Sequence, residues 1–381
     1  MASNQALQEV SDESEISETS EDEDSKVNSD SDTEKIIAGL DFDQDEILFH
    51  AIENLTPTIV KYLLKKGCNL NARYSTHADV ENESEKNTPL MKAFEINRMD
   101  IAKVLLKYGA EIGPALQHAA STGKLEIIEF LSKCNADEED INDEKCTPLH
   151  LVVKNDSLEE SDQLKAIKIL LENGANANAI DSKSNTALHY AVENSEEKII
   201  ELLLKYDIDI DVIDGYQQCA LHQAVDNEDV EVVELLLKNG ANINLKDMEL
   251  DTALHLASES GNTEIVELLL KYDIDIDAVN NTFRSALQIA SEKNNTEVVK
   301  TLLINGAKAN LANGTFFTMF SISTNEIRRY FFDYAINLDM NIRNNDTNTV
   351  FEEDIFLLDI TSAKKLLINQ LQAITFTFSC F

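Results

Sequence analysis

The stretch DTALHLASESGNTEIVELLL, residues 251–270, determines the fold of this chain, because close variants of it recur at a fixed interval. Its opening motif has counterparts in NTALHYAV from Asn185, QCALHQAV from Gln218 and RSALQIAS from Arg284. The shared leucines of these motifs lie 33 residues apart at each step, and they are Leu188, Leu221, Leu254 and Leu287. A constant period of this length is typical of a stacked array of repeated units.

Each motif is followed by a second apolar run, such as VEVVELLLKNG or EIVELLLKY. The pattern predicts two helices per unit, the second with a broad apolar face. Working outward, we predict an array over residues 45–313, with units at about 45–74, 87–113, 114–143, 145–180, 184–213, 217–246, 250–279 and 283–312.

Three irregularities in the spacing make specific predictions. The polar stretch 73–86 indicates a lengthened loop between the first two units. The second and third units are joined directly by GAEIGPAL, so we expect no projecting hairpin at that seam. The fourth unit carries a six-residue surplus, which we place in NDSLEESDQ, between its two helices.

Both flanks of the array differ from it in composition. Residues 1–40 are rich in Ser, Asp and Glu, and twelve acids against two lysines lie in the first 35 positions. Such a segment buries too little apolar surface to offset its ordering entropy, so we predict a disordered acidic arm. Residues 314–381 contain blurred copies of the pattern, which we interpret as degenerate terminal repeats or a capping segment.

The motif TPLH, Thr147 to His150, with the 33-residue period, resembles the ankyrin repeat family. The resemblance implies an all-α repeat solenoid, an ankyrin-type stack of helix-turn-helix units with β-hairpin loops. In this pattern Thr147, Thr186 and Thr252 cap the first helices, and Pro89 and Pro148 fit the first helical turn. Gly123 and Gly261 suit the positive φ that ends a first helix.

Two units differ from this sequence pattern at the end of the second helix, where both have KYDIDID, at 205–211 and 271–277. Asp207 and Asp273 replace a helix-ending glycine, and we expect them to tolerate the left-handed conformation. Asp211 and Asp277 replace a hairpin asparagine and so lose an amide donor. By alternation we expect Ile208 and Ile210 to turn inward, and Asp209 and Asp211 to face solvent.

The composition excludes several classes of function. A net charge of −38 opposes binding to nucleic acid or to an anionic membrane. Five cysteines without a CxxC pair, and no apolar run long enough to span a bilayer, indicate a reduced protein of the cytoplasm or nucleus. We predict that the repeated histidines bond locally rather than bind metal, and that the D-x-D strings are solvated hairpins rather than calcium loops. We therefore expect no enzyme activity, no cofactor and no metal.

What remains is a binding surface. In the ankyrin family the hairpin tips and first helices line a concave groove that binds proteins. By this resemblance we predict a non-catalytic scaffold, monomeric, whose concave acidic face binds a protein partner with a basic face. The residues expected to contact the partner are Asp181, Asp209, Asp211, Asp214, Tyr216, Asp247, Glu249, Asp251, Asp275, Asp277, Asn280 and Phe283.

Two alternatives remain open at this point. The chain could be a substrate-recognition subunit of a ubiquitin ligase that docks through a diverged helical box within 314–381. It could also be an inhibitor that masks a basic segment of a transcription factor, regulated through phosphorylation of its serine-rich arm. The sequence names neither the partner nor the pathway, and it does not say whether the partner is a host protein.

Overall fold

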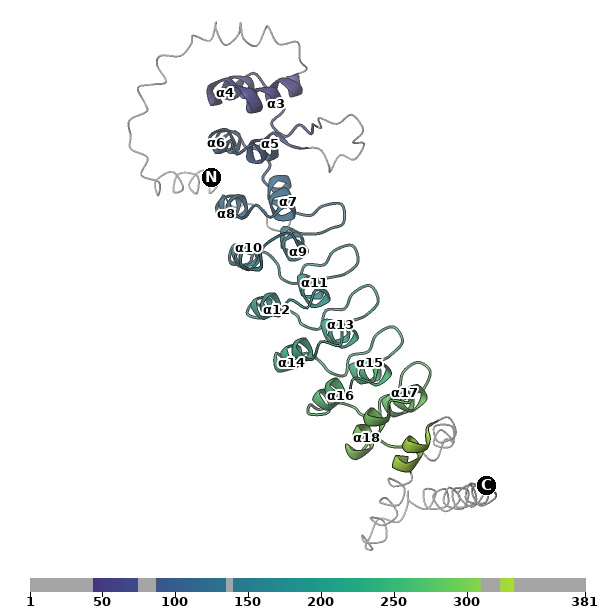
Figure 1. Ribbon diagram of the computed structural model, residues 1–381. Coiled ribbons are helices and arrows are strands. Elements are labelled where there is room, and N and C mark those ends of the chain that lie inside the picture. The colour runs from purple at the N-terminus through teal and green to yellow at the C-terminus, as the bar shows by residue number, and fades with distance from the viewer. Residues whose placement is uncertain (1–43, 75–86, 135–139, 310–322, 332–381) are drawn as a thin grey trace, which may run out of the picture. The chain divides into compact units, whose positions relative to one another are not determined.

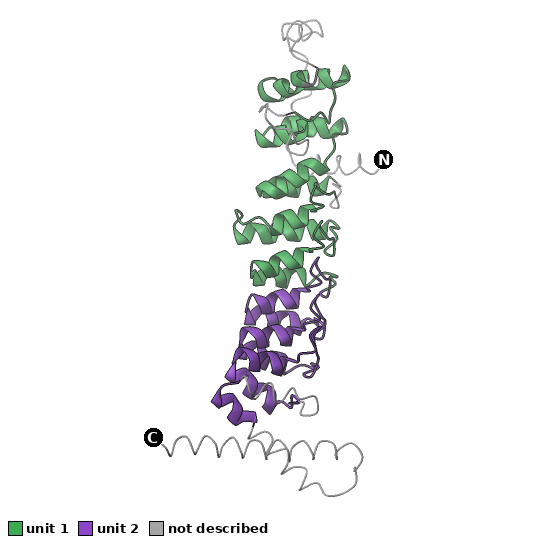
Figure 2. Ribbon diagram, turned by 90° about the vertical axis from the view of Figure 1, so that its right-hand side faces the viewer, with its two compact units in different colours: residues 1–209 green, residues 210–381 purple. Residues whose placement is uncertain are grey.

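The computed structural model describes residues 44–74, 87–134, 140–309 and 323–331, which divide between two compact units, residues 1–209 and 210–381 (Figure 2). The predicted arm at 1–40 lies outside the described residues, and of the segment 314–381 only 323–331 are described. We describe each unit by itself.

Unit 1 consists of antiparallel helix pairs, each made of a first and a second helix (Figure 1). The first helices are α3 (Gln44–Asn54), α5 (Pro89–Glu95), α7 (Gly113–Thr122), α9 (Pro148–Val153) and α11 (Ala187–Glu193). Their partners are α4 (Pro57–Lys65), α6 (Met99–Lys107), α8 (Leu125–Lys133), α10 (Glu160–Glu172) and α12 (Glu197–Leu203).

Unit 2 continues the same plan with three further pairs. The first helices are α13 (Ala220–Asp226), α15 (Ala253–Ser260) and α17 (Ala286–Lys293), and the second helices are α14 (Val230–Lys238), α16 (Thr263–Leu269) and α18 (Thr296–Ile304). In Figure 1 the hairpin loops of this unit project on the side of its first helices. A short helical segment at 325–331 follows, in which Ile327 and Phe331 are fully buried.

Stacking of like helices forms the core of each unit. In unit 2, α15 packs between α13 and α17, and α16 packs between α14 and α18. Leu254 and Ala257 of α15 and Ile265, Val266 and Leu269 of α16 are essentially inaccessible to solvent. An all-α stack of paired helices is therefore confirmed, and its apolar faces are buried only because each pair has neighbours.

The predicted helix starts are confirmed. Thr147, Thr186 and Thr252 each precede a first helix in extended conformation and form a capping box with the histidine three residues later. Pro89 and Pro148 occupy the first turn of their helices, where no N–H is needed. Gly123 and Gly261 end α7 and α15 with φ of 70° and 84°.

The direct join of the second and third repeats is confirmed, whereas the surplus of the fourth repeat lies only partly where it was predicted. Between α9 and α10 the chain needs residues 154–159, whereas the equivalent link between α11 and α12 is residues 194–196. The rest of the predicted segment, residues 160–163, instead lengthens the start of α10. Between α6 and α7 only residues 108–112 intervene, which leaves no room for a projecting hairpin. The lengthened loop after Arg73 is closed by an isolated bridge between Tyr74 and Asn87, and its residues 75–86 lie outside the described part.

The expectation for the KYDIDID units was wrong at the helix ends. Asp207 and Asp273 do not have positive φ, unlike the glycines at the equivalent place in other units. Instead α12 and α16 stop early, with right-handed caps at Leu204 and Leu270. A backbone bond from Ile208 N–H to the Tyr206 carbonyl then turns the chain, as does that from Ile274 to Tyr272. Without a glycine, shortening the helix costs less than placing an aspartate in the left-handed region.

Candidate functional site

The hairpin loops that lead into α9, α11, α13, α15 and α17 are the candidate site, and each is folded around one Asp or Asn side chain. In the loop 247–251, Asp247 N–H donates to the Asp251 carbonyl at 3.0 Å. One carboxylate oxygen of Asp247 then accepts the N–H groups of Glu249 and Asp251, at 3.0 and 2.8 Å. This is an Asx-type turn, in which the side chain replaces missing backbone partners. The same arrangement recurs at Asn142, Asp181, Asp214 and Asn280.

Four of the twelve predicted contact residues are therefore part of the turn itself. Asp181, Asp214, Asp247 and Asn280 are only 5%, 8%, 3% and 8% exposed. The interpretation of these four as displayed at the tips is corrected, because their oxygens point into the loop to accept backbone N–H groups. Burial opposes the charge of Asp181, but hydrogen bonds from Tyr190 and from the N–H groups of Asn185 and Lys183 lower its pKa.

Three further predicted residues, Asp211, Asp251 and Asp277, are half-buried and bond to the next repeat. Asp211 accepts the Asn242 N–H at 2.9 Å, and Asp277 accepts the Lys308 N–H at 2.8 Å. The inward turn of Asp211 corrects the alternation that had placed it in solvent, whereas Asp209 is exposed as expected and Ile208 and Ile210 are half-buried.

Asn244 occupies the repeat position that Asp211 and Asp277 occupy in the neighbouring repeats, and its side chain makes one more hydrogen bond than an aspartate can. Asn244 accepts the Asp275 N–H at 2.9 Å and also donates its amide to the Asp273 carbonyl at 3.1 Å. A carboxylate keeps only the accepting half of this pair.

Asp251 lies beside the turn and is linked to the next one. It accepts the Asn280 side-chain amide at 2.9 Å. Burial raises the pKa of Asp251, and the bond from Asn280 opposes that change.

The remaining five predicted residues face solvent. Asp209, Glu249 and Asp275 are exposed carboxylates, and Tyr216 and Phe283 are 73% and 80% exposed. They share the loops with apolar side chains that the sequence analysis missed: Ile141 and Ile180 in unit 1, and Ile213, Met248, Leu250 and Val279 in unit 2. A signal for four of them was available, because Ile141, Ile180, Ile213 and Val279 each directly precede the Asp or Asn that folds its loop.

The repeated histidines have the local role that was predicted for them. His255 Nδ1 accepts the Thr252 N–H at 3.1 Å and lies 2.8 Å from the Thr252 hydroxyl oxygen. Its Nε2 therefore carries the proton, and it donates to the Arg284 carbonyl at 3.1 Å. His150 and His222 bridge to Asn185 and Leu245 in the same way. Burial lowers the pKa of these histidines, so the neutral form that these bonds need is favoured.

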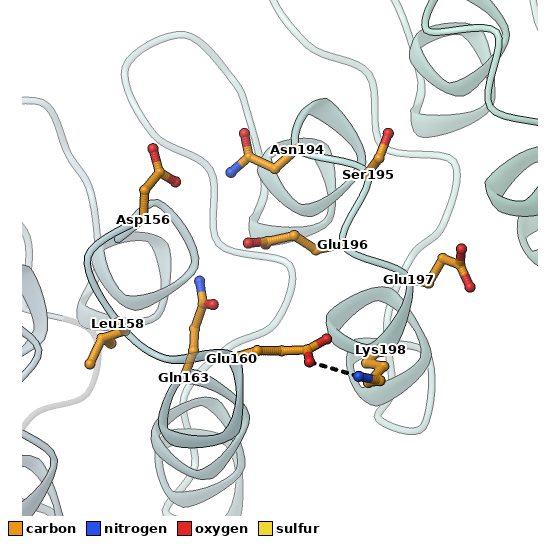
Figure 3. A pocket seen from close by; sticks show the side chains of 9 residues that line it. All are labelled: Asp156, Leu158, Glu160, Gln163, Asn194, Ser195, Glu196, Glu197 and Lys198. Carbon is orange, nitrogen blue, oxygen red and sulfur yellow. Dashed lines mark hydrogen bonds and ion pairs between the residues drawn. The ribbon is translucent and has the colours of Figure 1, made fainter.

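A separate hollow in unit 1 lies beside the insertion of the fourth repeat (Figure 3). It is lined mainly by polar and acidic side chains, among them Asp156, Glu160, Gln163, Glu196 and Lys198. Glu196 is directed between Asp156 and Gln163, and its Oε2 is buried without a hydrogen-bond partner. Burial, together with the charges of Asp156 and Glu160, raises the pKa of Glu196 to about 7. Glu160 itself pairs with Lys198 at 2.6 Å.

Over the described ranges, no group of three or more His, Cys, Asp or Glu side chains is arranged to hold a metal ion. In that same part of the chain, none of the helices has the length and apolar character needed to cross a bilayer. Cys134, Cys146 and Cys219 are buried free thiols, and burial raises the pKa of each.

Three relatives illustrate what the chain is similar to. A putative ankyrin repeat protein of Fowlpox virus (strain NVSL) is 27% identical over 159 residues, which is 39% of this chain and 19% of the relative. The nuclear factor NF-kappa-B p105 subunit of Gallus gallus is 33% identical over 160 residues, 39% of this chain and 15% of the relative. A putative ankyrin repeat protein of Rickettsia bellii (strain RML369-C) is 34% identical over 106 residues, 28% of this chain and 41% of the relative. The chain thus spans less than half of each relative.

A family model described as ankyrin repeats (3 copies) matches residues 25–114, 113–181, 159–247 and 221–313. These overlapping matches cover most of the chain and include every helix pair described above. Repeats of this kind are typically non-catalytic and generally serve as modules of protein–protein interaction. Period, capping boxes, paired helices and family model agree, and the chain belongs to the ankyrin repeat family.

Proposed function

We propose that this chain is a non-catalytic scaffold that binds a protein partner with a basic face through the solvent-facing part of its hairpin loops. The observation that carries the proposal is that the loop residues have two different roles, one in folding the turn and one in facing solvent. One Asp or Asn of each loop folds the turn, while other carboxylates of the same loops remain in solvent. A carboxylate that faces solvent can be reached by the cations of a partner.

The charge of the chain supports a basic partner. The formal net charge is −38, and the loop carboxylates add a local field that attracts Lys and Arg side chains. Complementary charge of this kind chiefly raises the association rate and excludes wrong partners. Nucleic acid and anionic lipid would be repelled by the same field.

The contact residues of the proposal are the exposed members of the predicted set, namely Asp209, Tyr216, Glu249, Asp275 and Phe283. Asp211, Asp251 and Asp277 contribute charge from half-buried positions. The ligase alternative depends on residues 314–381, which lie mostly outside the described residues, and the phosphorylated arm of the inhibitor alternative lies wholly outside them.

The test is quantitative affinity capture from cells that express the full chain. The hairpin variant is Asp209→Asn, Glu249→Gln, Asp275→Asn, which leaves unchanged the carboxylates of Asp211, Asp251 and Asp277 that bond to the next repeat. The matched control is Glu201→Gln, Glu234→Gln, Glu267→Gln, which removes the same charge from one repeated position on α12, α14 and α16. We expect the hairpin variant to lose interactors that the control retains. Equal retention by both variants would contradict the proposal.

A further inference from the structure

Two neighbouring hairpins of unit 2 present bulky apolar side chains to solvent. Met248 and Leu250 are 53% and 45% exposed, and Val279 and Phe283 are 42% and 80% exposed. We call these four residues the tip patch. One exposed apolar side chain is ordinary on a protein surface, whereas several on adjoining loops mark a contact surface.

The two loops are fixed to each other, so the tip patch is one surface. Asn281 N–H donates to the Glu249 carbonyl at 2.9 Å, directly between the two turns. The Lys246 ammonium donates to the Val279 carbonyl at 3.0 Å, and the Asn280 amide donates to Asp251 at 2.9 Å. Loops that are already ordered lose little further entropy when a partner binds.

The backbone at Leu250 and Phe283 adds a second, independent observation. Both have φ of 59°, in the left-handed region that bulky side chains avoid. Polar residues take the equivalent turn position in other repeats, as Lys145, Ser184 and Gln217 do. Leu250 and Phe283 therefore combine an unfavourable backbone with an unburied apolar side chain, and neither feature stabilises the fold. The turn imposes this φ in every one of these hairpins, but it does not require a large apolar side chain, so the choice of Leu and Phe here indicates a function.

The charges around the tip patch indicate the chemistry of its occupant. Glu249 and Asp275 are exposed nearby, and Asp251 and Asp277 are half-buried. The basic groups of these loops already have partners: Lys246 binds a carbonyl, Arg284 pairs with Glu292 at 3.0 Å and Lys308 pairs with Asp277 at 3.2 Å. Lys308 offsets the charge of Asp277, and the carbonyl bond leaves the charge of Lys246 in place, so Glu249, Asp251 and Asp275 against Lys246 give an excess of negative charge around an apolar centre.

We propose that the tip patch binds a partner segment that carries both apolar and Lys or Arg side chains, an amphipathic basic segment. Its apolar side chains pack on Leu250 and Phe283, and its cations meet the surrounding carboxylates. The inference rests on the proposed function and deepens it, because it names the chemistry of the partner. The carboxylates govern association and salt dependence, whereas the tip patch governs how long the complex lasts.

The test uses two synthetic peptides and the full chain. One is a fluorescent Leu/Lys peptide of about 18 residues with its leucines on one helical face, and the other has the same length and charge with Ser in place of Leu. The test variant is Leu250→Gly, Phe283→Gly. Glycine removes the side chain and accepts positive φ without strain, so the thermal midpoint should not fall. The control, Ser184→Gly, Gln217→Gly, makes the same backbone change without removing apolar surface.

We expect the Leu/Lys peptide to bind the wild-type chain at least about tenfold more tightly than the Ser/Lys peptide. The test variant should lose that advantage and keep the salt dependence, while the control changes affinity by less than about twofold. Unchanged binding of the Leu/Lys peptide by the test variant overturns the inference, even where the hairpin charge variant weakens binding as the proposed function requires. If the charge variant also binds normally, the proposed function fails as well.

Two further measurements complete the design. If the test variant is less stable than wild type, Leu250→Asn, Phe283→Asn replaces it, since Asn tolerates positive φ; retained peptide affinity in that variant also overturns the inference. Sedimentation velocity checks for self-association, and a dimer that is lost in the test variant would identify a second copy as the occupant instead.

Discussion

Replacing Glu196 by glutamine should stabilise unit 1 at neutral and alkaline pH. Glu196 precedes α12, at the repeat position where Asn295 precedes α18. Asn295 donates its amide to the carbonyls of Ser258 and Glu259, in the preceding repeat of unit 2. A carboxylate cannot donate in this way. In unit 1 the carbonyl that corresponds to that of Ser258 belongs to Val153, and the amide of Gln163 from the inserted segment donates to it and to the Val152 carbonyl.

The magnitude follows from the raised pKa of Glu196. Burial first, then the charges of Asp156 and Glu160, raise it from 4.5 to about 7, while a hydrogen bond from Gln163 opposes the change. Each tenfold change in proton affinity equals about 1.4 kcal/mol, so the charged form costs at most about 3.4 kcal/mol. Because Glu196 is partly open to the hollow, solvent screening reduces this to roughly 1–2 kcal/mol.

The sign with respect to pH is determined by which state binds the proton. Between pH 4.5 and about 7 the folded chain holds a proton on Glu196 that the unfolded chain has released. Stability contributed by this group is therefore complete below pH 4.5, and it is lost as the pH rises through about 7. Glu196→Gln should unfold at a higher urea concentration than wild type at about pH 8, by an amount equivalent to roughly 1–2 kcal/mol, and the gain should vanish near about pH 4.5.

The assay is urea denaturation followed by far-UV circular dichroism across this pH range, with Glu201→Gln as control. Glu201 is an exposed carboxylate on α12, and its removal should change stability by less than about 0.5 kcal/mol at every pH. A gain in stability that is equal at both ends of the pH range, or a loss of stability at alkaline pH, would refute the reasoning. Either result means that the charged, buried carboxylate of Glu196 does not destabilise the folded chain.

Three other predictions concern the repeat geometry. Asp247→Ala removes the acceptor of two backbone N–H groups in a buried turn and should cost about 2–3 kcal/mol, whereas Asp247→Asn keeps an acceptor and should cost less than half of that, as urea denaturation can measure. Burial lowers the pKa of His255, so the stability that depends on its neutral form is lost as pH falls below 6.5; His255→Gln, which has a precedent at Gln288 in the next repeat, should weaken this acid sensitivity in thermal melts at about pH 5 and pH 8. Gly261→Ala should be more destabilising than Gly240→Ala in the same assay, because the added Cβ would lie 2.8 Å from Asn295 in the first case and meet nothing within 4 Å in the second; similar losses would mean that the left-handed φ alone, at about 1 kcal/mol, sets the cost.

The sequence by itself determined the features that each repeat needs on its own. The 33-residue period located the helix pairs, and Thr147 with Pro148 marked a helix start. The period also located the surplus of the fourth repeat at residues 155–163, although only part of that segment lies between the helices. These are properties of local hydrogen bonding and of apolar periodicity, which a single repeat expresses in its own residues.

The tertiary structure decided every feature that depends on a neighbouring repeat or on the closing of a loop. Asp211 turned inward because Asn242 offers it an N–H from the next repeat, and Asp247 was buried because its loop closes over it. Leu250 and Phe283 came to lie on one surface because Asn281 joins the two turns that carry them. A row of letters gives the charge and size of each side chain, but which backbone groups surround that side chain is known only once the repeats are stacked.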